Sequence, residues 1–192
     1  EKARRYRILH LSTLNRFKGA LALIAALPYV VRVRNDVEFI FAGPWSDAGD
    51  QRKAKCILSE ENLTQFVTFT GPVITMEHKC ALYRSADVFV FPGIQQEGQP
   101  LVVLEAMAAG LPVLFTDRGC LKDTVGEGEA GFEVRIDDPQ HLADRLLWLL
   151  DHPEEMRVMG DNARKRFEAF YTAGRFVANM TQVLTRVTGE VP

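Results

Sequence analysis

Residues 88–115 read VFVFPGIQQEGQPLVVLEAMAAGLPVLF, and this pattern predicts a strand, a loop, a helix and a second strand. The apolar run 88–91 stops at Pro92. A helix is expected over 100–109 because Gly110 and Pro112 follow it, as they do at helix ends. The run 112–115 is again apolar and of strand length. Two strands joined by one helix form the unit from which parallel sheets are built.

The same alternation continues on both sides of this stretch. Further strands are expected over 7–11, 37–42, 66–70 and 131–134, and further helices over 18–33, 49–62, 75–85, 139–151, 153–169 and 172–187. Continuous apolar strands suit a sheet that helices cover on both faces. The sequence therefore predicts an α/β fold, a Rossmann-like doubly wound parallel sheet with extra C-terminal helices, in a single domain over 1–192.

Ligands of such sheets bind outside the carboxyl ends of the strands, where the strand order reverses. The loops that follow the expected strands are 12–18, 43–48, 71–74, 92–99 and 116–120. We therefore expect the functional residues in these loops.

The composition excludes several classes of protein. The chain has 192 residues, of which 47% are hydrophobic, and a formal net charge of −2. It lacks the basic excess of nucleic-acid-binding proteins, the low hydrophobicity of disordered chains and an apolar run long enough to span a bilayer. Its three cysteines, Cys56, Cys80 and Cys120, are widely spaced, which favours a reducing compartment, and we expect a cytoplasmic protein. The charged start Glu1–Arg7 does not resemble a signal peptide, and a first residue other than Met indicates a piece of a longer protein.

The start of the helix expected over 100–109 has the properties of an anion site. Pro100 suits the first helical position, where its missing N–H costs nothing. The amides of Leu101 and Val102 are then free to point out of the helix, at the positive end of its dipole. This arrangement favours a phosphate group.

Two carboxylates flank this helix start. Glu97 and Glu105 would lie about 12 Å apart along a continuous helix, but a loop that doubles back would let both border one pocket. A carboxylate only accepts hydrogen bonds, which suits a vicinal diol such as that of a ribose. The alternative is a solvated Glu97 and a Glu105 on the helix surface, and the residues alone leave both interpretations open.

Several motifs together resemble one family. The stretch Glu97-Gly-Gln-Pro-Leu-Val-Val-Leu-Glu105 resembles the Glu-x7-Glu signature of family 4 retaining glycosyltransferases, enzymes of the GT-B fold. Further similarities follow in the same order as in the family: Lys18-Gly19, Phe41-Ala-Gly-Pro44, Phe69-Thr-Gly-Pro-Val73, Ser85–Pro92 and Met159–Arg164. The resemblance runs from Ile8 to about Val183 and concerns the carboxyl-terminal, nucleotide-sugar-binding half. The amino-terminal half, which binds the acceptor, is missing.

The resemblance implies a role for each matched residue. Glu105 would bind the donor ribose, Glu97 the donor sugar, and Lys18 the diphosphate together with the amides of Leu101 and Val102. Backbone around Val73 would line the base. The catalytic residues implied are Glu97 and Lys18, without a metal ion or cofactor. The implied nucleotide-sugar-binding residues are Thr13, Lys18, Val73, Glu97, Gly98, Gln99, Pro100, Leu101, Val102 and Glu105.

Two positions depart from the family pattern. Thr13 stands where the family commonly has an arginine, a second cation for the diphosphate, and Arg16 is a candidate replacement. Gln99-Pro100 replaces the frequent Phe-Gly, and proline cannot donate an N–H to a phosphate.

The resemblance implies transfer of a hexose-type sugar from a UDP-, GDP- or ADP-linked donor to an acceptor, with retention of configuration. The isolated piece should turn over little, and the missing domain could attach the enzyme to a membrane. The alternatives are a non-catalytic Rossmann-like nucleotide-binding or interaction module, and a GT-B relative such as a phosphorylase or an epimerase.

The remaining candidate residues show weaker signals of a functional site. His10, His78, His141 and His152 are scattered without metal-ligand spacing, and His10 is expected in the core or at the cleft. The run 117–120 is either a loop facing the cleft or an ordinary turn. The apolar residues of the last helix should be exposed, because the resemblance implies that this helix packs toward the missing half.

Overall fold

The computed structural model describes residues 5–189, so Glu1–Arg4 of the charged start lie outside the described residues. One six-stranded sheet runs through the molecule in the order β3-β2-β1-β4-β5-β6. Its strands are β1 (Tyr6–Leu11), β2 (Val37–Ala42), β3 (Val67–Gly71), β4 (Val88–Phe91), β5 (Val113–Phe115) and β6 (Gly131–Glu133). All five strand pairings are parallel, which confirms the doubly wound parallel sheet.

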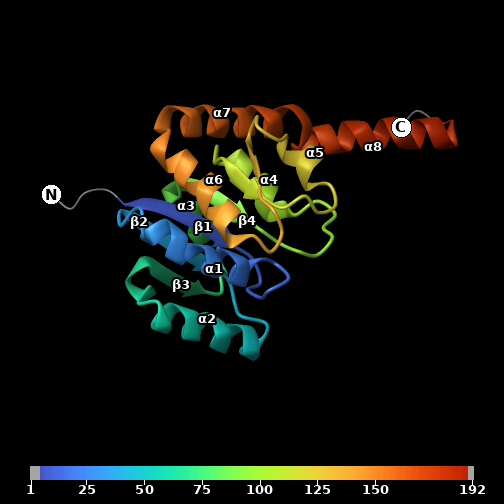
Figure 1. The fold of residues 1–192 in the computed structure, drawn as a ribbon. Helices are drawn as coiled ribbons and strands as arrows, with labels where there is room; N and C mark the ends of the chain where they lie inside the picture. The colour runs from blue at the N-terminus through green and yellow to red at the C-terminus, as the bar shows by residue number, and fades with distance from the viewer. Residues whose placement is uncertain (1–4, 190–192) are drawn as a thin grey trace.

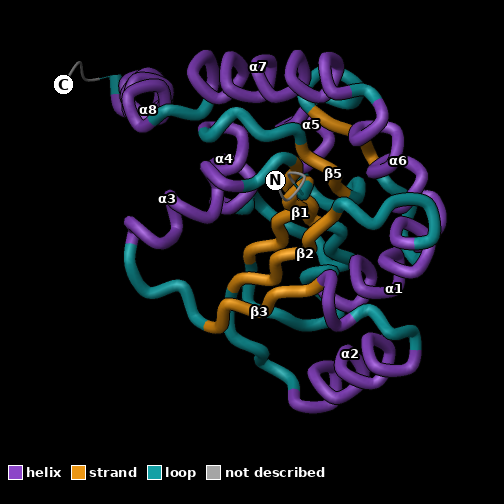
Figure 2. Tube along the Cα trace, turned by 90° about the vertical axis from the view of Figure 1, so that its left-hand side faces the viewer, coloured by secondary structure: helices purple, strands orange, loops and turns teal. Residues whose placement is uncertain are grey.

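Helices connect the strands and cover both faces of the sheet (Figures 1 and 2). They are α1 (Ala20–Val31), α2 (Ala48–Glu60), α3 (Met76–Ser85), α4 (Leu101–Ala108), α5 (Leu121–Val125), α6 (Pro139–Asp151), α7 (Pro153–Phe170) and α8 (Ala173–Thr188), with a 3-10 turn η1 at Thr64–Phe66. Figure 2 shows α1, α2 and α6 on one side of the strands and α3 and α4 on the other.

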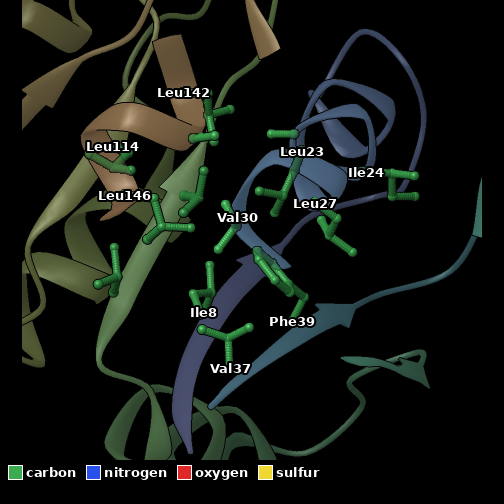
Figure 3. Packing of buried hydrophobic residues seen from close by; sticks show 14 of the residues in the cluster. Ile8, Leu23, Ile24, Leu27, Val30, Val37, Phe39, Leu114, Leu142 and Leu146 are labelled. Carbon is green, nitrogen blue, oxygen red and sulfur yellow. The ribbon is translucent and has the colours of Figure 1, made fainter. Parts of the chain in front are cut away.

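Side chains that alternate along the strands pack into two separate hydrophobic cores, one on each face of the sheet. In β1, Ile8 joins the cluster under α1 and α6, whereas Leu9 joins the cluster under α3 and α4. Figure 3 shows Ile8 and Phe39 of the sheet converging on side chains of α1 such as Leu23 and Leu27. Both faces of the central strands are therefore buried, as the apolar strands predict, whereas the edge strand β3 is partly exposed.

The reversal of strand order lies between β1 and β4. β1 pairs with β2 on one side and with β4 on the other, so the chain leaves these two neighbouring strands toward opposite faces. The loops after β1 and β4 therefore lie side by side at the carboxyl edge of the sheet.

The predicted elements have boundaries within two residues of the observed ones, and three differences lie in or next to the loops at the carboxyl edge of the sheet. Helix α1 begins at Ala20 rather than at residue 18, because Gly19 takes the left-handed backbone conformation (φ 92°). Helix α4 begins at Leu101, and Pro100 is its N-cap with an extended ψ of 116°, so the assignment of Pro100 to the first helical position is wrong by one residue. The short helix α5 lies where the sequence pattern predicts no helix.

Helix α8 extends away from the body of the molecule (Figure 1). Its apolar side chains are exposed, as predicted: Phe176 by 64%, Val177 by 61%, Met180 by 42% and Val183 by 52%. Among residues 5–189, no helix is both long and apolar enough to cross a membrane.

Candidate functional site

The loops after β1 and β4 bring Lys18 and Glu97 together. Lys18 Nζ lies 2.5 Å from Glu97 Oε1, although 79 residues separate the two in sequence. The amide of Ile94 donates to the Phe17 carbonyl (2.9 Å), which ties the two loops together. The Glu97 side chain is only 12% exposed and also accepts from Gln95 Nε2 (2.8 Å). This burial contradicts the interpretation of Glu97 as a freely solvated residue.

The start of α4 offers unused hydrogen-bond donors. Within the described chain, the first backbone N–H of this helix to be bonded is that of Val103, which donates to the Pro100 carbonyl (3.0 Å). The amides of Leu101 and Val102 precede it, no side chain caps the helix, and its first turn holds no acidic residue. Free amides at the positive end of the helix dipole can bind an anion, and Gly98 and Gln99 form the exposed loop that leads into them.

Glu105 lies in the second turn of α4, and its side chain contacts residues of α3. Lys79 Nζ lies 2.5 Å from Glu105 Oε1, and Tyr83 Oη lies 2.9 Å from Glu105 Oε2. The cavity beside Glu105 has a volume of about 300 Å³. Its lining residues are Met76, Lys79, Cys80, Tyr83, Arg84, Glu105, Ala108, Ala109 and Arg164. Glu97 is not among these lining residues. The two carboxylates pair with different lysines, Glu97 with Lys18 and Glu105 with Lys79.

The remaining residues implied by the family resemblance line the same edge of the sheet. Val73 is half-buried in the loop between β3 and α3, next to the exposed Ile74. Thr13 is exposed in the loop after β1. The side chain of Arg16 turns toward α2, where its Nε lies 3.8 Å from the carboxylate of the buried Asp50. Arg16 is therefore already paired with an acidic residue, Asp50.

The loop after β5 holds the Glu97 loop in place, a contact that sequence reasoning left open. The amide of Gly119 donates to Gln96 Oε1 (2.8 Å), Thr116 Oγ1 bonds the Gly93 carbonyl, and Cys120 Sγ bonds the Gly98 carbonyl. Gly119 itself has a φ of 65°, and a Cβ there would overlap the carbonyl group of Glu97. Apart from Asp117-Arg118-Gly119-Cys120 following a strand, the sequence carries no signal for these contacts.

His10 is buried beneath the two loops, in agreement with its expected place in the core. Its Nδ1 lies 2.9 Å from the Val90 carbonyl and its Nε2 lies 2.8 Å from Ser12 Oγ. A carbonyl only accepts, so Nδ1 carries the proton and Nε2 accepts from the Ser12 hydroxyl. Burial lowers the pKa of His10 to about 4, so the imidazole is neutral at physiological pH.

This shifted pKa makes stability depend on pH in a defined window. The pKa of His10 is about 4 in the folded chain and near 6.5 in the unfolded chain, so the unfolded chain binds the proton first as the pH falls. The contribution of His10 is complete above pH 6.5 and is lost between pH 6.5 and 4, about 3 kcal/mol in total. Urea unfolding at several pH values should show this loss. The loss should disappear in His10→Gln, and an equal loss in that variant would contradict the assignment.

Comparison with known proteins identifies the family. Residues 1–166 match the family described as "Glycosyl transferases group 1". The chain belongs to the group 1 glycosyl transferases. It is 32% identical over 171 residues to a phosphatidyl-myo-inositol mannosyltransferase of Mycobacterium leprae, covering 88% of this chain and 44% of that protein. The chain spans about half the length of the curated relatives it matches.

Solved structures of group 1 glycosyl transferases and related proteins share the fold. HepE of Anabaena, solved in complex with UDP, superposes with a TM-score of 0.87 at 20% identity over 96% of this chain and 50% of that one. The C-terminal domain of the group 1 protein LpcC from Francisella tularensis superposes with a TM-score of 0.79 at 21% identity, covering 88% of this chain and 87% of that domain. The sheet is therefore one Rossmann-like half of a GT-B fold.

Proposed function

We propose that this chain is the carboxyl-terminal, donor-binding half of a glycosyltransferase that transfers a sugar from a nucleoside diphosphate sugar with retention of configuration. The observation that carries the proposal is the arrangement around the start of α4. There the free amides of Leu101 and Val102 and the Lys18–Glu97 ion pair lie by the loops at the carboxyl edge of the sheet, and Glu105 follows one turn into α4, paired with Lys79 of α3. An acceptor-binding domain absent from this chain would complete the enzyme.

Each group in this arrangement has a chemical task in the proposal. The diphosphate lies at the start of α4, where the two amides and Lys18 balance the negative charge that grows on it as the sugar leaves. Glu97 accepts hydrogen bonds from hydroxyl groups of the sugar and orients it. Glu105 binds the ribose, and the backbone around Val73 lines the base. Protein groups carry out this step in the proposed mechanism, which gives no role to a metal ion or cofactor.

The Lys18–Glu97 pair connects the two parts of the donor. Lys18 Nζ lies 2.5 Å from the Glu97 carboxylate. An arriving diphosphate offers the same ammonium group a second anionic partner, and lysine has three N–H donors with which to serve both. Lys18 would therefore link the leaving group to the carboxylate that holds the sugar.

The donor class is a UDP-, GDP- or ADP-linked hexose. Among the similar structures, HepE was solved with UDP, with UDP and glucose, and with UDP-glucose, which supports a nucleotide-sugar donor for this chain. We further propose a cytoplasmic location and a role in carbohydrate biosynthesis, with any attachment to membranes supplied by the missing half.

The intact protein tests this function. It should release nucleoside diphosphate from one class of donor only when an acceptor is present, and NMR of the product should show the same anomeric configuration as the donor. An inverted product would contradict retention. Binding of the nucleotide sugar without turnover, whichever acceptor is added, would favour the non-catalytic module. Phosphate-dependent cleavage of a glycoside would favour a phosphorylase, and conversion of the donor sugar into its epimer would favour an epimerase.

A further inference from the structure

Two side chains of α3 hold the carboxylate of Glu105 from one side. Lys79 and Tyr83 are four residues apart, so they occupy the same face of the helix and reach α4 together. Lys79 Nζ lies 2.5 Å from Oε1, and the Tyr83 hydroxyl lies 2.9 Å from Oε2. Each oxygen of Glu105 therefore has its own partner.

The Tyr83 hydroxyl has one proton and two acceptors within reach. The Val102 carbonyl lies 3.0 Å away and the Glu105 carboxylate 2.9 Å away. Hydrogen bonds to a charged acceptor are shorter and stronger, so the proton goes to Glu105. Burial and the neighbouring carboxylate raise the pKa of Tyr83, so the hydroxyl stays protonated and remains a donor. Tyr83 is 5% exposed, so its ring is fixed in place.

The Glu105 carboxylate keeps free hydrogen-bond acceptor positions. A carboxylate accepts about four hydrogen bonds, two at each oxygen. Lys79 occupies one position on Oε1 and Tyr83 one on Oε2, which leaves one acceptor position on each oxygen. Glu105 remains 32% exposed, so these positions are open to a ligand. A ribose presents two adjacent hydroxyl donors, one for each oxygen.

We propose that Lys79 and Tyr83 are positioning residues that fix the Glu105 carboxylate so that its two open acceptor positions receive the 2′ and 3′ hydroxyls of the donor ribose. The site then selects ribonucleotides over 2′-deoxyribonucleotides through residues on α3 that never touch the nucleotide. This inference rests on the proposed function, in which Glu105 binds the ribose.

The experiment compares a ribonucleotide with its 2′-deoxy form on this chain. UDP, GDP and ADP are titrated calorimetrically, each beside 2′-deoxy-UDP, 2′-deoxy-GDP or 2′-deoxy-ADP, and the ratio of the two dissociation constants is the readout. The native chain should bind the ribonucleotide about tenfold more tightly or better, the factor expected for one hydrogen bond to a charged group. Lys79→Met and Tyr83→Phe should weaken the ribonucleotide, which loses two hydrogen bonds, more than the deoxynucleotide, which has only its 3′ hydroxyl on Glu105, so that the ratio falls toward one.

Arg84→Met is the matched control. Arg84 belongs to the same helix and lines the same cavity, but the ion pair of Glu105 is formed with Lys79 rather than with Arg84. Its loss should leave the ratio unchanged. Thermal unfolding of each variant without nucleotide shows whether the fold is retained, and Lys79→Met, at a side chain that is 25% exposed, carries the test if Tyr83→Phe fails to fold.

Two results would overturn the inference. A native ratio retained in both Lys79→Met and Tyr83→Phe would show that Glu105 needs no positioning. Equal weakening of both nucleotides would show that Lys79 acts on the phosphates or on the fold. Failure of the proposed function gives a different result, because Glu105→Ala would then bind every nucleotide as the native chain does.

Discussion

Replacing Lys18 by methionine in the intact enzyme should lower turnover of the donor about 10²–10³-fold, because removal of one preorganised donor that stabilises developing negative charge has an effect of this size. Lys18 is the cation that the structure places next to Glu97, at 2.5 Å, with its side chain 27% exposed and so within reach of a ligand. Methionine keeps most of the volume of the side chain and removes only the charge. Turnover is measured as nucleoside diphosphate released.

Lys18→Met should affect turnover and nucleotide affinity to different extents. The Glu97 side chain is 12% exposed and, among residues 5–189, would keep only Gln95 as a hydrogen-bond partner. Nucleotide affinity should fall less than turnover, because the amides of Leu101 and Val102 and the carboxylate of Glu105 remain. Lys53→Met, at an exposed position on α2, is the control and should keep full turnover. Turnover of Lys18→Met within about threefold of the native value, far from the expected loss, would contradict the role of Lys18.

Replacing Gly119 by alanine should remove most of the turnover while nucleotide binding persists. Gly119 has a φ of 65°, and an added Cβ would overlap the carbonyl group of Glu97. The loop 93–98 must then move, and with it the carboxylate that orients the sugar. A displacement of about 1 Å at a reacting centre can cost about 10²-fold in rate. Glu105 and its partners on α3 lie outside this contact, so affinity for the nucleotide should change by only a few-fold.

Gly128 provides a matched control for this substitution. Its φ of 76° is as unfavourable for alanine as that of Gly119, but an added Cβ meets nothing within 4 Å. Gly128→Ala should therefore cost only about 1–2 kcal/mol of unfolding free energy and leave turnover intact. Equal effects of the two substitutions on turnover would show that backbone conformation alone is responsible, and that the contact between Gly119 and Glu97 has no part in catalysis.

Much of the fold could be predicted from the sequence because most strands are short, largely apolar runs with Gly or Pro close to one end. The runs ending at Pro92 and at Gly43-Pro44 became β4 and β2. Helix boundaries were less accurate where a single backbone angle decides them, as at Gly19 and Pro100. Helix α5 was missed because five residues are too few to show a helical period.

The candidate site was predictable where topology alone brings residues together. Lys18 and Glu97 follow neighbouring strands at the reversal of strand order, so their meeting follows from the fold class. The partners of Glu105 were not predictable, because the rotation of α3 against α4 depends on side-chain packing across the whole face of the sheet. The support of the Glu97 loop by residues 116–120 was also missed, since it consists largely of bonds to backbone groups that any sequence offers.

The roles assigned to all the site residues remain predictions, and those of Thr13, Val73, Gly98, Gln99 and Pro100 rest on position alone. The structure places all five in loops at the carboxyl edge of the sheet, where the fold predicts the ligand. Arg16 pairs with Asp50, so a contribution of Arg16 to the diphosphate would require this pair to open.

Thermal unfolding of this chain with millimolar UDP, GDP or ADP tests the central claim most directly, namely that a nucleotide site lies between α4 and the loops after β1 and β3. A nucleotide present at about 100 times its dissociation constant stabilises the folded chain by about 2.7 kcal/mol, which raises the midpoint by about 5–10 °C for a domain of this size. We predict such a shift with one of the three nucleotides and its loss in Glu105→Ala, whose midpoint without nucleotide serves as the reference. No shift with any nucleotide, or the same shift with and without Glu105, would contradict the claim.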